Sequence, residues 1–148
     1  MMRLALDTNV LAYAEGVNGE AMKKIAVEVV TKLPESTTFI PVQVLGELFH
    51  LLLRKGGRTP QHAQAAISSW QDVFATIETS PAVLATALDL AVHHHFSIWD
   101  AVALSAASTA GCRLFLSQDL QDGFKWNGVT VANPFAKTKH PLLLGLLA

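Results

Sequence analysis

Four carboxylate side chains stand at the edges of apolar runs and have the types and spacing for chemistry: Asp7, Glu47, Asp100 and Asp119. Asp7 and Asp119 follow short apolar, strand-like segments, whereas Glu47 and Asp100 fall in apolar segments that read as helices. A carboxylate beside core-forming segments is unfavourable unless its charge is neutralised. A hard divalent cation commonly neutralises several converging carboxylates. The pattern therefore points to metal-dependent chemistry on a phosphate group.

Three of these acids also have a structural interpretation. Asp7 is placed to cap the helix that follows its strand. The segment Ser97-Ile98-Trp99-Asp100 has the spacing of a capping box, which would explain Asp100 without catalysis. Asp119 could close the turn that begins at Ser117. Capping and catalysis are both open for these positions on local sequence alone.

Glu47 is harder to explain structurally. On a helix it shares a face with apolar residues at offsets of one, three and four, namely Val44, Leu48 and Leu51. A glutamate on the solvated surface of a helix would more commonly have polar neighbours. This position therefore favours a functional carboxylate.

Three further polar residues are candidates for supporting roles. Asn9 and Ser117 are predicted to orient the acidic site through an amide and a hydroxyl group. Asp122 precedes Gly123 in a plain turn signal and is an additional candidate for metal contact.

Other kinds of site find less support. The three consecutive histidines, residues 93–95, are not spaced three or four apart as helix-borne zinc ligands are, and we expect them near the end of a helix. Cys112 opens an apolar strand and is expected in the core. The chain has no Gly-x-Gly-x-x-Gly or Walker loop, and its serines lack the context of a nucleophile elbow.

The predicted elements that position the acids alternate between strand and helix. Strands are expected at 4–6, 37–40, 73–79, 112–116 and 129–132, and helices at 8–14, 20–33, 42–55, 60–72, 81–95 and 97–110. This alternation predicts an α/β fold with a central parallel sheet of about five strands and helices on both faces. Sites in such folds lie beyond the carboxyl ends of the strands, where Asp7 and Asp119 fall.

Composition indicates a single folded domain. The chain has 148 residues, of which 51% are hydrophobic and 16% charged, so a single domain spanning 1–148 is expected and a disordered chain is excluded. A net charge of −1 does not indicate nucleic-acid binding, so any such contact must be local. We expect a cytoplasmic protein without a membrane role. The chain has a single cysteine, no uninterrupted signal-peptide core and no apolar run of membrane-spanning length.

Four stretches taken together resemble the PIN-domain ribonucleases, in particular the VapC-type toxins of bacterial toxin–antitoxin modules. They are LDTNVL at 6–11, PVQVLGEL at 41–48, SIWDA at 97–101 and LSQDLQDG at 116–123. With Asn133-Pro134-Phe135 near the end, the similarity spans roughly residues 2 to 135. Nothing is carried over to the apolar tail, residues 137–148, which is expected to pack on this molecule or on a second copy.

The resemblance implies an α/β/α sandwich and an endoribonuclease dependent on Mg²⁺ or Mn²⁺. It matches Asp7, Glu47, Asp100 and Asp119 to the family's acidic quartet and leaves the role of Asp122 open. Our hypothesis is that Asp7 and Asp100 bind the metal most directly, while Glu47 and Asp119 complete the shell or position water. An RNA substrate, an antitoxin partner that screens the acidic site, and a homodimer are further implications of the resemblance.

Two other functions remain as alternatives. An aspartyl-phosphate phosphatase also places its nucleophile after a first strand, but such enzymes typically show Asp-x-Asp, and here Asn9 stands two residues after Asp7. A PIN-like binding module that has lost its chemistry is the non-enzymatic alternative. Metal binding without nuclease activity would support it.

Overall fold

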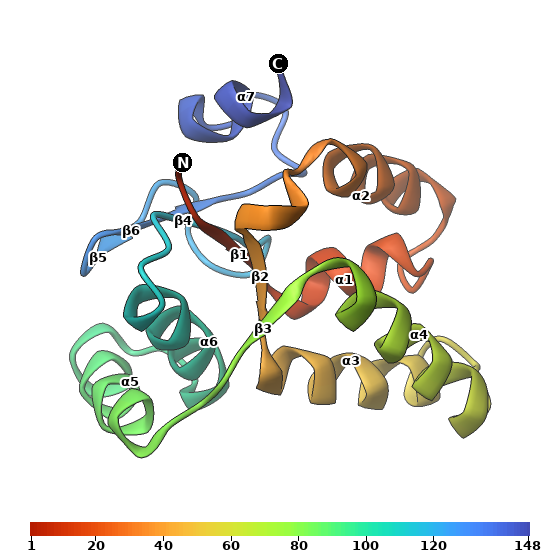
Figure 1. Cartoon of the computed structure of the whole chain (residues 1–148), viewed down its shortest axis with the longest axis horizontal. Coiled ribbons are helices and arrows are strands. Elements are labelled where there is room, and N and C mark those ends of the chain that lie inside the picture. Colours follow the sequence, from red (N-terminus) through yellow and green to blue (C-terminus); the bar gives the residue numbers. More distant parts are fainter.

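A computed structural model describes all residues, 1–148, and its centre is a sheet of six strands in the order β3-β2-β1-β4-β6-β5 (Figure 1). The strands are β1 (Leu4–Leu6), β2 (Thr38–Pro41), β3 (Ala75–Ile77), β4 (Leu114–Leu116), β5 (Lys125–Trp126) and β6 (Val129–Ala132). Only β5 pairs antiparallel, with β6; every other neighbouring pair is parallel. The predicted α/β fold is confirmed, with one strand more than expected.

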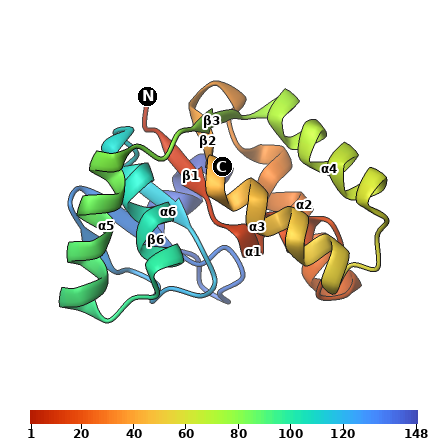
Figure 2. The same cartoon turned by 90° about the horizontal axis from the view of Figure 1, so that it is seen from below.

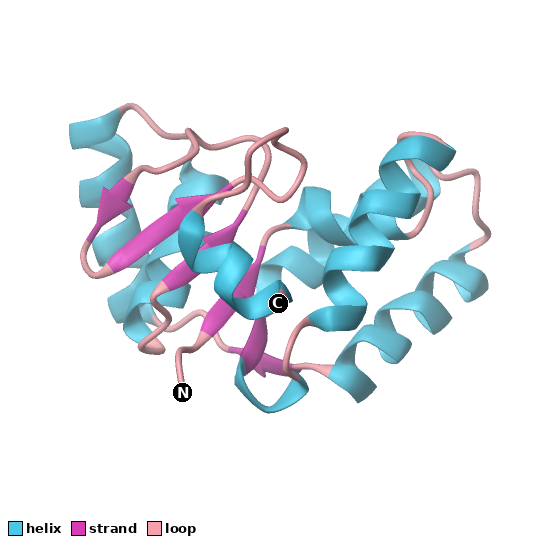
Figure 3. Cartoon of the chain, turned by 90° about the horizontal axis from the view of Figure 1, so that it is seen from above, coloured by secondary structure: helices cyan, strands magenta, loops and turns pink.

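Helices cover both faces of this sheet, as predicted. They are α1 (Thr8–Ala14), α2 (Glu20–Lys32), α3 (Val42–Arg54), α4 (Pro60–Val73), α5 (Pro81–His94), α6 (Ile98–Thr109) and α7 (Pro141–Leu147). Figure 1 shows α5 and α6 on one side of the sheet and α1, α2 and α7 on the other. Figure 2 shows α3 running outward from the end of β2, with α4 beside it. The strands form one twisted layer between the helices (Figure 3).

Local capping signals explain where three of the helices begin. The side chains of Thr59, Ser80 and Ser97 each accept a hydrogen bond from the backbone amide three residues further on, at 3.2 Å. Proline occupies the start of α4 and of α5, where its missing N–H is not needed. His95 ends α5 in the left-handed conformation, with φ of 58°. The histidine run therefore lies at a helix end, as predicted.

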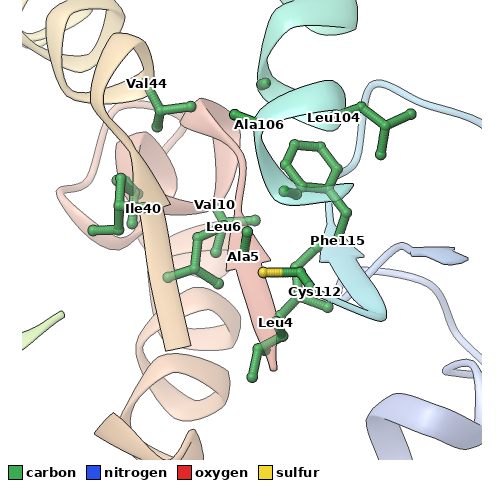
Figure 4. Packing of buried hydrophobic residues seen from close by; sticks show 14 of the residues in the cluster. Leu4, Ala5, Leu6, Val10, Ile40, Val44, Leu104, Ala106, Cys112 and Phe115 are labelled. Carbon is green, nitrogen blue, oxygen red and sulfur yellow. The ribbon is translucent and has the colours of Figure 1, made fainter. Parts of the chain in front are cut away.

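The core is a single cluster of 34 buried residues that joins the sheet to the helices. All residues of the central strands β1 and β4 have no exposed surface. Because both faces of these strands are covered, their sequences are continuously apolar instead of alternating. Figure 4 shows Leu6 near Val10 and Ile40, and Phe115 pointing towards α6. Cys112 belongs to the same core, as predicted, and burial raises the pKa of its thiol to about 11.

The unpredicted strand β5 forms a hairpin with β6. Trp126 pairs with Val129 across a two-residue turn, in which Asn127 has φ of 48° and Gly128 has φ of 84°. Positive φ at both central residues is the geometry that favours Asn-Gly in such turns. A strand of two residues is too short to show a period, but the Asn-Gly pair was a usable signal.

The apolar tail folds back on this molecule. Helix α7 packs against α2 and buries Leu143 completely, while Leu144 stays 50% exposed. None of the helices combines the length and apolarity needed to cross a membrane.

We predict that Phe115→Ala lowers the free energy of unfolding by about 3–5 kcal/mol, because it removes a fully buried ring from the central strand. The control is Val27→Ala on α2, where the side chain is 38% exposed and the change should stay within about 0.5 kcal/mol. Urea denaturation followed by circular dichroism measures both. Equal effects of the two substitutions would contradict this description of the core.

Candidate functional site

Asp7 lies where β1 leaves the sheet, and it is 4% exposed. Its backbone amide donates to the carbonyl oxygen of Leu116 at 3.0 Å and so extends the pairing of β1 with β4. Its Oδ1 accepts from the Thr8 amide at 2.8 Å, which makes Asp7 the cap of α1. Its Oδ2 accepts from Ser117 Oγ at 2.7 Å and from Asn9 Nδ2 at 3.3 Å. A carboxylate has about four acceptor positions, so at least one remains for another ligand.

Ser117 and Asn9 join the start of α1 to the loop that follows β4. The Oγ of buried Ser117 accepts from the Asp119 amide at 3.2 Å while donating to Asp7. The Oδ1 of Asn9 accepts from the Gln118 amide at 3.0 Å. These bonds set the backbone of Asp119 relative to the Asp7 carboxyl group.

Glu47 lies on α3, half-buried, with Val44 and Leu48 of the same face in the core. Its Oε2 accepts from Thr8 Oγ1 at 3.4 Å, and its Oε1 accepts from Gln43 Nε2 at 3.2 Å. The same Gln43 nitrogen donates to the backbone carbonyl of Trp99 at 2.7 Å. Gln43 therefore links the helix that carries Glu47 to the start of α6.

Asp100 lies in the first turn of α6 and is half-buried. Its backbone amide donates to Ser97 Oγ, which is the first half of the capping box. The reciprocal bond from the Ser97 backbone amide to the Asp100 carboxylate is not formed; instead the Ser97 side chain favours the ionised form of this carboxyl group. Asp119 is exposed on the loop after β4, and its side chain makes no hydrogen bond within the protein.

Charge and burial raise the pKa values of three of these acids. Burial raises the pKa of Asp7 to about 7; hydrogen bonds from Ser117 and Thr8 oppose this rise, and the charges of Asp100 and Asp119 add to it. Burial also raises the pKa values of Glu47 and Asp100. Asp100 and Asp119 act on Glu47, and Asp119 acts on Asp100. The fold thus brings Asp100 and Asp119 within electrostatic reach of both Asp7 and Glu47, although 40 or more residues separate most of these acids in sequence.

The donor set suits a hard cation, because carboxylate oxygens are the ligands that Mg²⁺ and Mn²⁺ prefer. In the arrangement described here, no three His, Cys, Asp or Glu side chains lie close enough together to hold one ion. Asp119 and Asp100 are the outer members of the cluster, and neither carboxylate is held by a backbone donor. A bound cation would offset the charges of Asp100 and Asp119, which add to the burial that raises the pKa of Asp7.

Asp122 lies apart from this electrostatic cluster. It is exposed, its Oδ1 accepts from the backbone amide of Asn133 at 2.9 Å, and it has no resolved effect on the pKa of Asp7, Glu47 or Asp100. The Asp122 carboxylate therefore holds the loop after β4 against the segment that follows β6.

Thr8, Gln43 and Trp99 contact the acids or each other and were not among the residues singled out from sequence. Gln43 stands four residues before Glu47 on one helix, so the helical repeat could have identified it. The contact of Thr8 with Glu47 spans 39 residues of sequence and had no local signal.

A scan against family models matches residues 4–125 of this chain to the PIN domain. The chain belongs to the PIN domain family. Solved toxin–antitoxin proteins share this PIN-domain fold. Their sequence identities to this chain are 20% or lower, so the similarity concerns the fold alone. No curated protein matches it in sequence.

One such structure is Mycobacterium tuberculosis VapC20, described as a toxin that cleaves the sarcin–ricin loop. It has a TM-score of 0.64 and 20% identity over 76% of this chain and 86% of that one. A toxin–antitoxin complex from Klebsiella pneumoniae has a TM-score of 0.66 and 17% identity over 89% of this chain and 98% of that one. VapBC2 from Rickettsia felis, bound to a promoter DNA fragment, has a TM-score of 0.65 and 15% identity over the same shares.

The raised pKa of Asp7 predicts how stability depends on pH. Between its unfolded value of 3.8 and its folded value of about 7, the folded chain keeps a proton that the unfolded chain has released. In EDTA, the free energy of unfolding should therefore fall as the pH rises through this interval, by at most roughly 4 kcal/mol from this group. Asp7→Asn should lose most of this fall.

Urea denaturation of the wild type and Asp7→Asn at pH values from 4 to 8, in EDTA, tests this dependence. Glu47 and Asp100 contribute in the same direction and leave a smaller residual fall in the variant. The same pH dependence in both proteins would show that Asp7 ionises normally in the folded chain.

Proposed function

We propose that this PIN domain is a metal-dependent endoribonuclease that cleaves RNA phosphodiester bonds, and that it is the toxin of a toxin–antitoxin module. The observation that carries the proposal is the gathering of four acids at the carboxyl edge of a parallel sheet, where the charges of Asp100 and Asp119 add to the burial that raises the pKa values of Asp7 and Glu47. Carboxylates that are buried or close together without a cationic partner are poor structural elements but good ligands for a divalent cation. Family membership and the toxin structures that share the fold support the same conclusion.

In this proposal, Asp7 and Asp100 hold Mg²⁺ or Mn²⁺ most directly, and Glu47 and Asp119 complete the shell or position water. A bound cation would stabilise charge on the phosphate and lower the pKa of a water molecule. Asp7 is held by three donors from the protein, which suits a fixed ligand. The less constrained Asp100 and Asp119 are suited to adjust around the ion. Ser117 and Asn9 keep Asp7 in one orientation.

We further propose that the partners are an RNA substrate, an antitoxin protein and a second copy of the chain, and that the protein acts in the cytoplasm. Solved relatives by fold include several toxin–antitoxin complexes. This chain also has apolar surface available for association. Leu84, Leu88 and Val92 recur every four residues on α5 and are 44%, 50% and 71% exposed.

Purified protein should cut cellular RNA into discrete fragments with Mg²⁺ or Mn²⁺, and not in EDTA. Asp7→Asn and Asp100→Asn should abolish this cleavage while the circular dichroism spectrum stays unchanged, because each removes a metal ligand. The matched control is Asp72→Asn, an exposed aspartate on α4 away from the acids, which should cleave as the wild type does. Full activity of either folded site variant, or cleavage that survives EDTA, would overturn the proposal.

The binding-module alternative predicts a different result in the same experiment. A folded wild type that binds Mn²⁺ but cleaves no RNA would favour it.

Asp122→Asn should retain cleavage, because the carboxylate of Asp122 holds a backbone amide and has no resolved effect on the pKa values of the other acids.

Ser117→Ala should weaken metal binding by about 10- to 100-fold, because it removes the shortest hydrogen bond to Asp7 while leaving all four carboxylates in place. Titration with Mn²⁺ by calorimetry measures the affinity directly, and the Mg²⁺ concentration that gives half-maximal cleavage provides a second readout. The control is Ser69→Ala on α4, whose hydroxyl bonds only within its own helix. An unchanged Mn²⁺ affinity in Ser117→Ala would show that Ser117 does not position a metal ligand.

A further inference from the structure

Trp99 is an exposed aromatic residue directly beside the acidic site. It immediately precedes Asp100 in the first turn of α6 and is 62% exposed, whereas Trp70 and Trp126 are partly buried. Tryptophan is enriched at binding interfaces, because it offers a large apolar ring together with one polar N–H group. Capping of α6 needs only Ser97, so the helix start does not account for a tryptophan at this position.

A hollow of about 350 Å³ lies between Trp99 and the outer side of α3, lined by Gln43, Gly46, Glu47, His50 and Trp99. Its size is at the lower end of the range for small-molecule sites, about 300–1,000 Å³. One lining residue, Glu47, is also an acid of the proposed catalytic site, so the hollow adjoins that site. The bond from Gln43 Nε2 to the Trp99 carbonyl at 2.7 Å holds the two walls together.

Gly46 keeps this hollow open. It lies in the middle of α3, where glycine is the least favourable residue after proline. Its φ is not positive, and a Cβ at this position would meet nothing within 4 Å. Neither backbone conformation nor close packing in this chain requires glycine there. Because glycine has no side chain, the helix surface between Gln43 and His50, which lie on the same helix face, is left uncovered.

We propose that the hollow between Trp99 and Gly46 binds one unpaired nucleobase of an RNA, next to the phosphodiester at the acids. This inference rests on the proposed function and adds a recognition subsite to it. Bases stack on exposed aromatic rings in single-stranded RNA recognition, and every base offers a flat face. The free Oε1 of Gln43 and the exposed imidazole of His50 can bond the edge of a base. The mainly apolar lining suits the flat face of a base, and these polar atoms suit its edge, which an aliphatic side chain lacks.

The test measures binding of a short single-stranded RNA to Asp7→Asn protein, with Mg²⁺ present, by quenching of tryptophan fluorescence and by anisotropy of a labelled RNA. In this background, Trp99→Ala should weaken binding by at least about fivefold, the effect expected from losing one base–aromatic stack. Trp99→Phe should retain most of the affinity. Trp126→Phe, on β5, is the control for the fluorescence signal and should leave both binding and quenching in place.

Substitution of Gly46 provides a second, independent test, which separates an effect on RNA binding from an effect on folding. Gly46→Leu should fill the hollow and weaken RNA binding by a similar factor, while thermal unfolding shows a helix at least as stable as before. The matched control is Gly145→Leu on α7, a helical glycine outside the hollow whose Cβ would also meet nothing within 4 Å, and this variant should bind RNA as its parent does.

Unchanged RNA affinity in both Trp99→Ala and Gly46→Leu would overturn this subsite, whether or not the wild type cleaves RNA. Weaker RNA binding in both variants supports the subsite, even if the wild type fails the cleavage assay and the proposed nuclease activity is abandoned.

Discussion

The buried carboxyl group of Asp7, held where β1 and β4 leave the sheet, is the constraint on which the acidic site depends. Parallel pairing makes the two strands end at the same level, and the Asp7 amide still donates to Leu116 there. The first side chain after β1 therefore meets the first one after β4, and Ser117 donates to Asp7 across the junction. On the other side of β1, strand β2 ends at the same edge, and α3 carries Glu47 outward from it.

Without a bound cation, the buried carboxyl group of Asp7 lowers the stability of the fold. Burial and neighbouring charge raise the pKa of Asp7 to about 7, so near neutral pH the site must either hold protons or tolerate repulsion. A core designed only for stability would not place a carboxyl group there. Natural proteins retain such local conflicts mainly where function requires them. The hydrogen bonds from Thr8, Asn9 and Ser117 keep the carboxyl group oriented despite this conflict.

The short segment from Ser97 to Asp100 combines three tasks in one helical turn. Ser97 caps α6, Trp99 offers an exposed ring, and Asp100 supplies a carboxylate. Gln43 connects this turn to α3 by bonding both Glu47 and the Trp99 carbonyl. A displacement of α3 relative to α6 would therefore change the acidic site and the adjoining hollow together. In the proposed function, recognition of a base and positioning of the phosphate depend on the same contact between two helices.

Local sequence was sufficient for most elements and for the positions of the acids along them, although not for the two-residue strand β5 or the terminal helix α7. Buried parallel strands are continuously apolar, and serine, threonine and proline mark helix starts, so β1, β4, α4 and α6 were predictable within a few residues. The convergence of Asp7, Glu47, Asp100 and Asp119 depends on the strand order β2-β1-β4, which long-range pairing sets. For the same reason the bond from Thr8 to Glu47, the separation of Asp122 from the site and the hollow beside Trp99 emerged only in three dimensions. Capping and periodicity act over a few residues, whereas a site is made by strands whose neighbours lie far away in the chain.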